Sequence, residues 1–194
     1  MGLADLYTKR QRIAELARNK RGVALSTLHH VIDLERMKAA YRLTRKDGAP
    51  GIDGVMAAEY AQNLEANLLD LLERIKSGRY EAPPVRRVYI PKADDSLRPL
   101  GLPTFEDKVA QRAAVMVLEA VYEQDFLPCS YGFRPSRSAH QALCELRTAF
   151  MEHGLRWVLD IDIVKYFDSI PHPHLRNFLD RRVTDGVIRR MIDK

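Results

Sequence analysis

An acidic segment near the end of the sequence, residues 156–170, limits most strongly what this chain can fold into. It begins as a run of β-forming residues and carries three aspartates, Asp160, Asp162 and Asp168. If residues 156–163 form a strand, Asp160 and Asp162 point to the same face. Two neighbouring carboxylates repel each other, so a fold tolerates them only beside a cation, a donor or water. With the aromatic pair Tyr166 and Phe167 just beyond it, the predicted strand suits a metal and nucleotide site.

The composition is that of a globular, mildly basic protein. The 194 residues are 46% hydrophobic and 29% charged, which is enough for a core. A net charge of +5 permits a polyanionic partner without proving one. The two cysteines, Cys129 and Cys144, form no Cys-x-x-Cys pair, which argues against a zinc site built on thiolates. Free cysteines are usually buried, so we expect both in the core. We expect a cytoplasmic protein, because unpaired cysteines fit a reducing compartment and the sequence shows neither a membrane-length apolar run nor a secretory signal.

Residues 1–46 form a predicted basic, helical N-terminal extension. Eleven Lys and Arg residues stand against four Asp and Glu residues, a net charge of +7 within a chain of +5. Apolar residues at helical spacing predict helices over about 3–20 and 30–45. The charge suits nucleic acid, but a solvated helix face would have the same pattern.

The next segments alternate tight turns and helices. Residues 47–54 read as a rigid double turn, in which Pro50-Gly51 suits the centre of a type II turn. A helix is predicted over 57–77 and ends at Gly78. A protruding β-hairpin follows over about 85–103, where Lys92 and Arg98 flank the turn and could lie across from each other. These are either a pair of fixed cations or ordinary protection of an exposed edge.

The second half of the chain is predicted to be mostly helical. Thr104 resembles a capping residue for a helix that runs to about 123. The polar and aromatic loop 130–138 either contacts nucleic acid or packs on the surface. Further helices are expected over 138–152, 172–181 and 184–194. The last one ends without a cap, which suggests a truncated domain, although a natural frayed end gives the same pattern.

Several blocks, taken in order, resemble group II intron-encoded reverse transcriptases, also called maturases. The matching blocks are residues 48–54 (Gly-Ala-Pro-Gly-Ile-Asp-Gly), 87–92, 98–104, 130–135 and 162–170. The resemblance covers roughly residues 30–194. It implies an α+β (mixed α/β) fold: the fingers subdomain of a right-hand polymerase over 47–155, then the first strand and helices of a truncated palm over 156–194.

The resemblance also implies a site for nucleotidyl transfer with two Mg²⁺ ions, with Mn²⁺ as an alternative. Asp162 would be the catalytic metal ligand, joined by the backbone carbonyl of Ile163, while Asp160 and Asp168 would support it. Phe167 would exclude a ribose 2′-hydroxyl. The incoming dNTP would contact Lys92, Arg98, Lys165, Tyr166 and Phe167.

RNA template and primer and intron RNA are the implied nucleic-acid partners, and a DNA target is a further candidate. The side chains expected to bind nucleic acid are Arg10, Arg12, Lys20, Arg21, Arg45, Lys46, Arg134 and Arg137. The sequence leaves the oligomeric state open, and it implies no membrane partner.

The sequence also departs from the family pattern. It lacks the Tyr-x-Asp-Asp block that supplies two further carboxylates, and it lacks the expected thumb. Val164, Lys165 and Tyr166 stand where Lys-Gly and Phe are commoner. We therefore expect the isolated chain to be inactive as a polymerase. Two alternatives remain: an RNA-binding, maturase-like fragment without polymerase activity, and a relative that serves CRISPR or phage defence.

Overall fold

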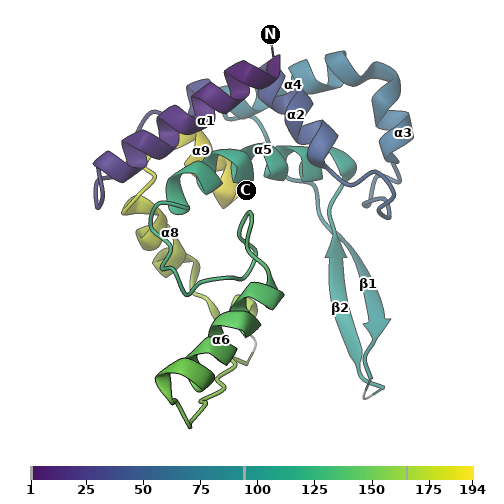
Figure 1. Cartoon of the computed structure of the whole chain (residues 1–194). Helices are drawn as coiled ribbons and strands as arrows, with labels where there is room; N and C mark the ends of the chain where they lie inside the picture. Colours follow the sequence, from purple (N-terminus) through teal and green to yellow (C-terminus); the bar gives the residue numbers. More distant parts are fainter. Residues whose placement is uncertain (1, 94, 165) are drawn as a thin grey trace.

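The computed structural model combines many helices with a small antiparallel sheet, and it describes residues 2–93, 95–164 and 166–194 (Figure 1). This confirms the predicted mixed α+β class. The helices are α1 (Gly2–Asn19), α2 (Leu34–Leu43), α3 (Ala57–Tyr60), α4 (Leu64–Ser77), α5 (Phe105–Tyr122), α6 (Ala139–His153), α7 (Tyr166–Ser169), α8 (His172–Asp180) and α9 (Gly186–Asp193). Two 3₁₀ turns, η1 (His29–Val31) and η2 (Ala61–Asn63), and the strands β1 (Arg86–Pro91) and β2 (Leu97–Leu102) complete the described elements.

Helix α5 forms the centre of the hydrophobic core. Val109, Ala113, Val117 and Val121 recur every fourth residue, so they share one face of the helix, and all four are fully buried. Helices α1 and α2 pack against α5, and α4 packs against α2. Thr104 caps α5 as predicted, because its hydroxyl accepts the amide of Asp107 at 3.2 Å.

The helix predicted over 57–77 is interrupted by η2. Asn67 Nδ2 donates to the Tyr60 carbonyl at 2.9 Å, which supplies a partner for a carbonyl at the break. Beyond it, α4 runs to Ser77 and ends at Gly78 in the left-handed conformation (φ 77°), as predicted. Leu68, Leu71 and Ile75 form the buried face of α4.

The C-terminal segment is fastened to the N-terminal one. Leu25 and Val183 form a parallel bridge. Arg182 lies under the end of α1, where its guanidinium donates to the carbonyls of Ala17, Lys20 and Val23 at 2.8–2.9 Å and pairs with Asp125 at 2.6 Å. These contacts hold the start of α9 against the end of α1.

Asp185 completes this junction as the N-cap of α9. Its side chain is completely buried, and its two oxygens accept the amides of Leu28, His29, Val187 and Ile188 at 2.6–3.1 Å. Burial alone would raise the pKa of Asp185, but these hydrogen bonds and the His29 side chain hold it at about 2.

One core cluster draws residues from all three predicted regions. It joins Ile13 of α1 and Leu71 of α4 with Val117 of α5 and Ile188 of α9. The regions therefore share their hydrophobic interior. Their boundaries as extension, fingers and palm remain a prediction.

The predicted strand over 156–163 is wrong. These residues adopt no regular structure, and their apolar side chains face outward, with Trp157 93% exposed. A strand needs a neighbour to pair its amides and carbonyls. In the described part of the chain, β1 and β2 pair with each other, and residues 156–163 pair with neither of them.

Two smaller expectations are also wrong. Cys129 and Cys144 are exposed rather than buried, because one lies in the loop after α5 and the other on the largely exposed helix α6. The turn at 47–54 has its positive φ at Gly54 (71°) instead of Gly51, which excludes a type II turn centred on Pro50-Gly51.

Within the residues that the structure describes, no helix has both the length and the apolar character required to cross a membrane.

Candidate functional site

The β-hairpin projects away from the helices and carries both predicted triphosphate-binding cations (Figure 1). Arg98 lies directly opposite Ile90, and the Lys92 amide bonds to the Ser96 carbonyl at 2.8 Å, so Lys92 and Arg98 are diagonal neighbours rather than a facing pair. Alternation along the strand puts Ile90, Lys92 and Arg98 on one face. Both cations are exposed, and neither side chain forms an ion pair with a described residue. The hairpin thus presents, on one face, two positive charges that no described acidic residue neutralises.

The base of the hairpin is fixed by close backbone packing. A Cβ atom on Gly51 would lie 2.5 Å from Thr104 Cα, so only glycine fits where the 47–54 loop crosses the end of β2. Lys108 Nζ also donates to the Ala49 carbonyl at 2.8 Å. The loop therefore presses its backbone against the junction between hairpin and α5.

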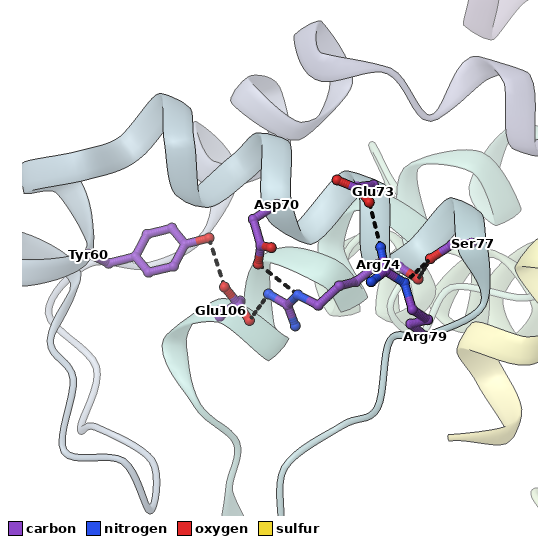
Figure 2. A network of polar contacts seen from close by, with 7 residues as sticks. All are labelled: Tyr60, Asp70, Glu73, Arg74, Ser77, Arg79 and Glu106. Atoms are coloured by element: carbon purple, nitrogen blue, oxygen red, sulfur yellow. Dashed lines mark hydrogen bonds and ion pairs between the residues drawn. The ribbon is translucent and has the colours of Figure 1, made fainter.

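A polar network fixes the first turn of α5 to α4 (Figure 2). Arg74 lies between two carboxylates, donating to Glu106 at 2.6 Å and to Asp70 at 2.7 Å. The Tyr60 hydroxyl donates to the other oxygen of Glu106 at 3.4 Å. Burial, followed by the charge of Glu106, raises the pKa of Tyr60, so the phenol stays protonated as a donor.

A second, more buried set of contacts surrounds Asp107. This carboxylate accepts hydrogen bonds from the Tyr80 hydroxyl and from Gln111 Nε2, the latter at 2.9 Å. Burial, and then the hydrogen bond to Asp107, raises the pKa of Tyr80. Together the two networks hold the helix that follows β2, and with it the hairpin base, in one position.

The acidic segment presents its predicted site residues to solvent. Asp160, Asp162 and Ile163 are exposed on the irregular segment, and Phe167 on α7 is 86% exposed with its ring 5.3 Å from that of Tyr166. Lys165 and the side chain of Asp168 lie outside the described residues. Among described residues, no hydrogen bond or ion pair links this segment to the hairpin, and no group of three or more potential metal ligands is assembled. The metal site remains a prediction.

The predicted RNA-binding cations differ in whether they already contact acidic, aromatic or carbonyl groups of the chain. Arg10, Arg12 and Lys20 are exposed on or next to α1 and have no ion-pair partner among the described side chains. Arg45 pairs with Asp47, and Lys46 lies 4.2 Å from the centre of the Tyr41 ring. Burial lowers the pKa of Lys46. Arg21 bonds to the Gln124 carbonyl at 3.3 Å.

The cations of the loop after α5 contact the loop itself and the end of α5. Arg134 is only 8% exposed in its side chain, pairs with Glu123 through two nitrogens, and donates to the carbonyls of Leu127 and Ser130. Arg137 donates to the Pro128 carbonyl at 3.2 Å and lies over the Tyr131 ring. These contacts favour the alternative that this loop packs on itself.

Comparison with known proteins identifies the family of this chain. The family model described as reverse transcriptase (RNA-dependent DNA polymerase) matches residues 90–193, more than half of the chain. The chain therefore belongs to the reverse transcriptase family. Its named relatives place it with the group II intron reverse transcriptases and maturases.

Three relatives illustrate the match. Protein YkfC of Escherichia coli K12 is 41% identical over 140 residues, 71% of this chain and 37% of that protein. Group II intron-encoded protein LtrA of Lactococcus lactis is 39% identical over 131 residues, 67% of this chain and 22% of LtrA. Nuclear intron maturase 1 of Arabidopsis thaliana is 30% identical over 91 residues, 47% of this chain and 12% of that protein. The chain spans well under half the length of these proteins.

Proposed function

We propose that this chain is the N-terminal part of an RNA-directed DNA polymerase of the group II intron type. In the complete enzyme it would position an incoming dNTP on an RNA template and primer, and it would bind intron RNA. The observation that carries the proposal is the pair of uncommitted cations, Lys92 and Arg98, on one face of a hairpin whose base is rigidly held.

The hairpin cations suit a triphosphate. A guanidinium donates to two phosphate oxygens at once, and an ammonium adds a compact charge. Because both side chains lie on the same face, they can contact one ligand together. A fixed hairpin base keeps them there before the nucleotide arrives, which reduces the entropy lost on binding.

The donor chemistry of the acidic segment suits magnesium. Asp162 offers a carboxylate and Ile163 a backbone carbonyl, both oxygen ligands of the kind Mg²⁺ prefers. Bound divalent ions would stabilise charge on the attacking 3′-oxygen and on the leaving phosphate oxygen. Asp160, two residues away, would support Asp162. Two-metal catalysis would need further carboxylates beside Asp162.

Phe167 is proposed as the residue that selects deoxyribonucleotides. Its exposed ring would pack under the sugar, where a ribose 2′-hydroxyl would collide with it. Tyr166 and Lys165 would face the phosphates through their amides.

The second candidate function is RNA binding without polymerisation by the isolated chain. It is favoured by the exposed cations Arg10, Arg12 and Lys20, which have no ion-pair partner among the described residues. Arg134 is left out of the proposed RNA surface because its charge is already paired.

The test compares dNTP use in a longer protein that joins this chain to the remaining polymerase segments. We expect Lys92→Ala and Arg98→Ala each to raise the KM for dNTP about tenfold, since each removes a charge-assisted contact. Arg87→Ala is the matched control, because Arg87 lies on the same strand but alternates to the opposite face. An unchanged KM in both hairpin variants would refute the proposed nucleotide site.

The catalytic assignment has its own test in the same protein. Asp162→Ala should abolish primer extension while RNA binding stays within a few-fold, because the carboxylate binds metal and not template. Retained extension would remove Asp162 from the metal site. The isolated chain should bind RNA without extending a primer, and detectable dNTP incorporation would overturn that expectation.

A further inference from the structure

A pocket between α1, α2 and α5 is separate from the hairpin and the acidic segment. It has a volume of about 300 Å³. Helix α1 contributes Tyr7 and Arg10, α2 contributes Arg36 and Arg42, and α5 contributes Glu119. These three helices pack together at the N-terminal side of the molecule (Figure 1). The volume is at the lower end of the range of about 300–1,000 Å³ for small-ligand sites, which suits one small group rather than a helix.

The three arginines of this pocket have unused donor capacity among the described residues. Arg36 is 1% exposed, and although its Nε donates to the Val31 carbonyl at 2.8 Å, its Nη2 has no hydrogen-bond partner in the described part of the chain. Arg10 and Arg42 are exposed and form no ion pair with any described residue. Buried guanidinium nitrogens are normally paired, so Arg36 Nη2 is an unusual donor without an acceptor among the described residues.

The electrostatic balance points to an anion of low charge. Burial lowers the pKa of Arg36; the Asp33 carboxylate opposes this shift, and the Arg10 charge adds to it. Arg10 and Arg36 thus repel each other at the pocket. Glu119 makes no ion pair with a described cation and leaves the lining with a net charge of +2. Such a balance favours a single phosphodiester over a polyphosphate.

The rest of the lining is apolar. Leu6 and Ala39 are buried, while the Tyr7 side chain is 63% exposed beside them. An exposed aromatic ring next to arginines is the combination that holds an unpaired base by stacking and its phosphate by charge.

We propose that this pocket binds one nucleotide of single-stranded RNA, with the phosphodiester on the arginines and the base on Tyr7. The proposal rests on the proposed RNA-binding function and names a place where that binding occurs. A duplex would not use it, because its bases are already stacked and paired.

Binding of a fluorescein-labelled single-stranded RNA to the whole chain tests the proposal by fluorescence anisotropy. We expect Tyr7→Ala and Arg42→Ala each to weaken binding about tenfold. Arg79→Ala is the matched control, since Arg79 is an exposed arginine after α4, paired with Glu73 and outside the pocket. Tyr7→Phe should retain binding because it keeps the ring. Circular dichroism checks that each variant is folded.

The salt dependence of RNA binding distinguishes the phosphate contact of Arg42 from the base contact of Tyr7. Arg42→Ala should lower the slope of log K against log salt by about 0.7, whereas Tyr7→Ala should leave the slope unchanged, because only the former removes a phosphate contact. Duplex RNA of the same sequence should be insensitive to Tyr7→Ala, and equal losses on duplex would overturn the proposal. If the unmodified chain binds no RNA, the proposed RNA-binding function fails. If it binds RNA and both variants match Arg79→Ala, only the pocket assignment fails.

Discussion

At the scale of single residues, Asp185 is the clearest contributor to stability. Its buried carboxylate accepts hydrogen bonds from both the 28–29 turn and the first turn of α9. Removing its charge leaves several buried amides without an anionic acceptor. We expect Asp185→Asn to lower the free energy of unfolding at pH 7 by about 2 kcal/mol, as measured by urea denaturation. Asp53→Asn is the control, because Asp53 is exposed and, among the described residues, accepts a hydrogen bond only from the Val55 amide.

The pH dependence of this effect follows from the depressed pKa of Asp185. Its pKa falls from 3.8 to about 2 in the folded chain, so the folded state binds fewer protons than the unfolded state between these values. The stabilisation is complete above pH 4 and is lost as the pH falls toward 2. The difference between the unmodified chain and Asp185→Asn should therefore narrow across that range. A difference that stays constant down to pH 2 would contradict this account.

Phe167 allows a residue-scale prediction about nucleotide selection. In the longer polymerase, Phe167→Val should accept ribonucleotides more readily, because a smaller side chain leaves room for the 2′-hydroxyl. The measurement is the ratio of kcat/KM for dNTP over NTP in primer extension, which should fall at least tenfold. Tyr166→Val is the companion variant: an effect there and none at Phe167 would transfer the selecting role to Tyr166.

At the scale of elements, the hairpin depends on the loop that crosses its base. Gly51→Ala would place a Cβ atom 2.5 Å from Thr104 Cα, and backbone cannot move aside as a flexible side chain can. We expect a loss of about 2 kcal/mol in thermal or urea unfolding, typical of overpacking. Gly48→Ala in the same loop is the control, since its Cβ would meet only the end of the Lys108 side chain at 3.8 Å. Equal stability of the two variants would show that the crossing is not tight.

Some of these elements could be predicted from the sequence, and others could not. Helix α5, its Thr104 cap, the end of α4 at Gly78 and the hairpin follow from local spacing and turn chemistry, so they were predictable. The structure of residues 156–163 was not, since a run of β-forming residues becomes a strand only beside a partner. The roles of Arg182 and Asp185 depend on residues more than 150 positions earlier, which no local pattern reveals.

The candidate site was predictable to a similar extent. The cations of the hairpin were identified from the turn between them, although their diagonal register required the structure. Arg36 carried no sequence signal, because a buried arginine on α2 looks like any other basic helix position. The pairing of Arg134 with Glu123 likewise depends on how the loop folds back on α5.

At the scale of the whole molecule, stability is unevenly distributed. Helices α1, α2, α4, α5 and α9 share the core, whereas residues 156–163 are exposed and irregular. In hydrogen–deuterium exchange, we expect amides of 156–163 to exchange within seconds and those of α5 to be the slowest. Strong protection of 156–163 in the isolated chain would mean that this segment finds a partner that the structure does not show.

The bridge between Leu25 and Val183 has a consequence for synthesis on the ribosome. The end of α1 cannot make its contacts with Arg182, nor the 28–29 turn its contacts with Asp185, until translation has reached residue 185. At about 5–20 residues per second, the first helix waits on the order of ten seconds for these partners. During that interval the apolar face of α1 is incompletely covered, which makes the nascent chain a natural client for a chaperone.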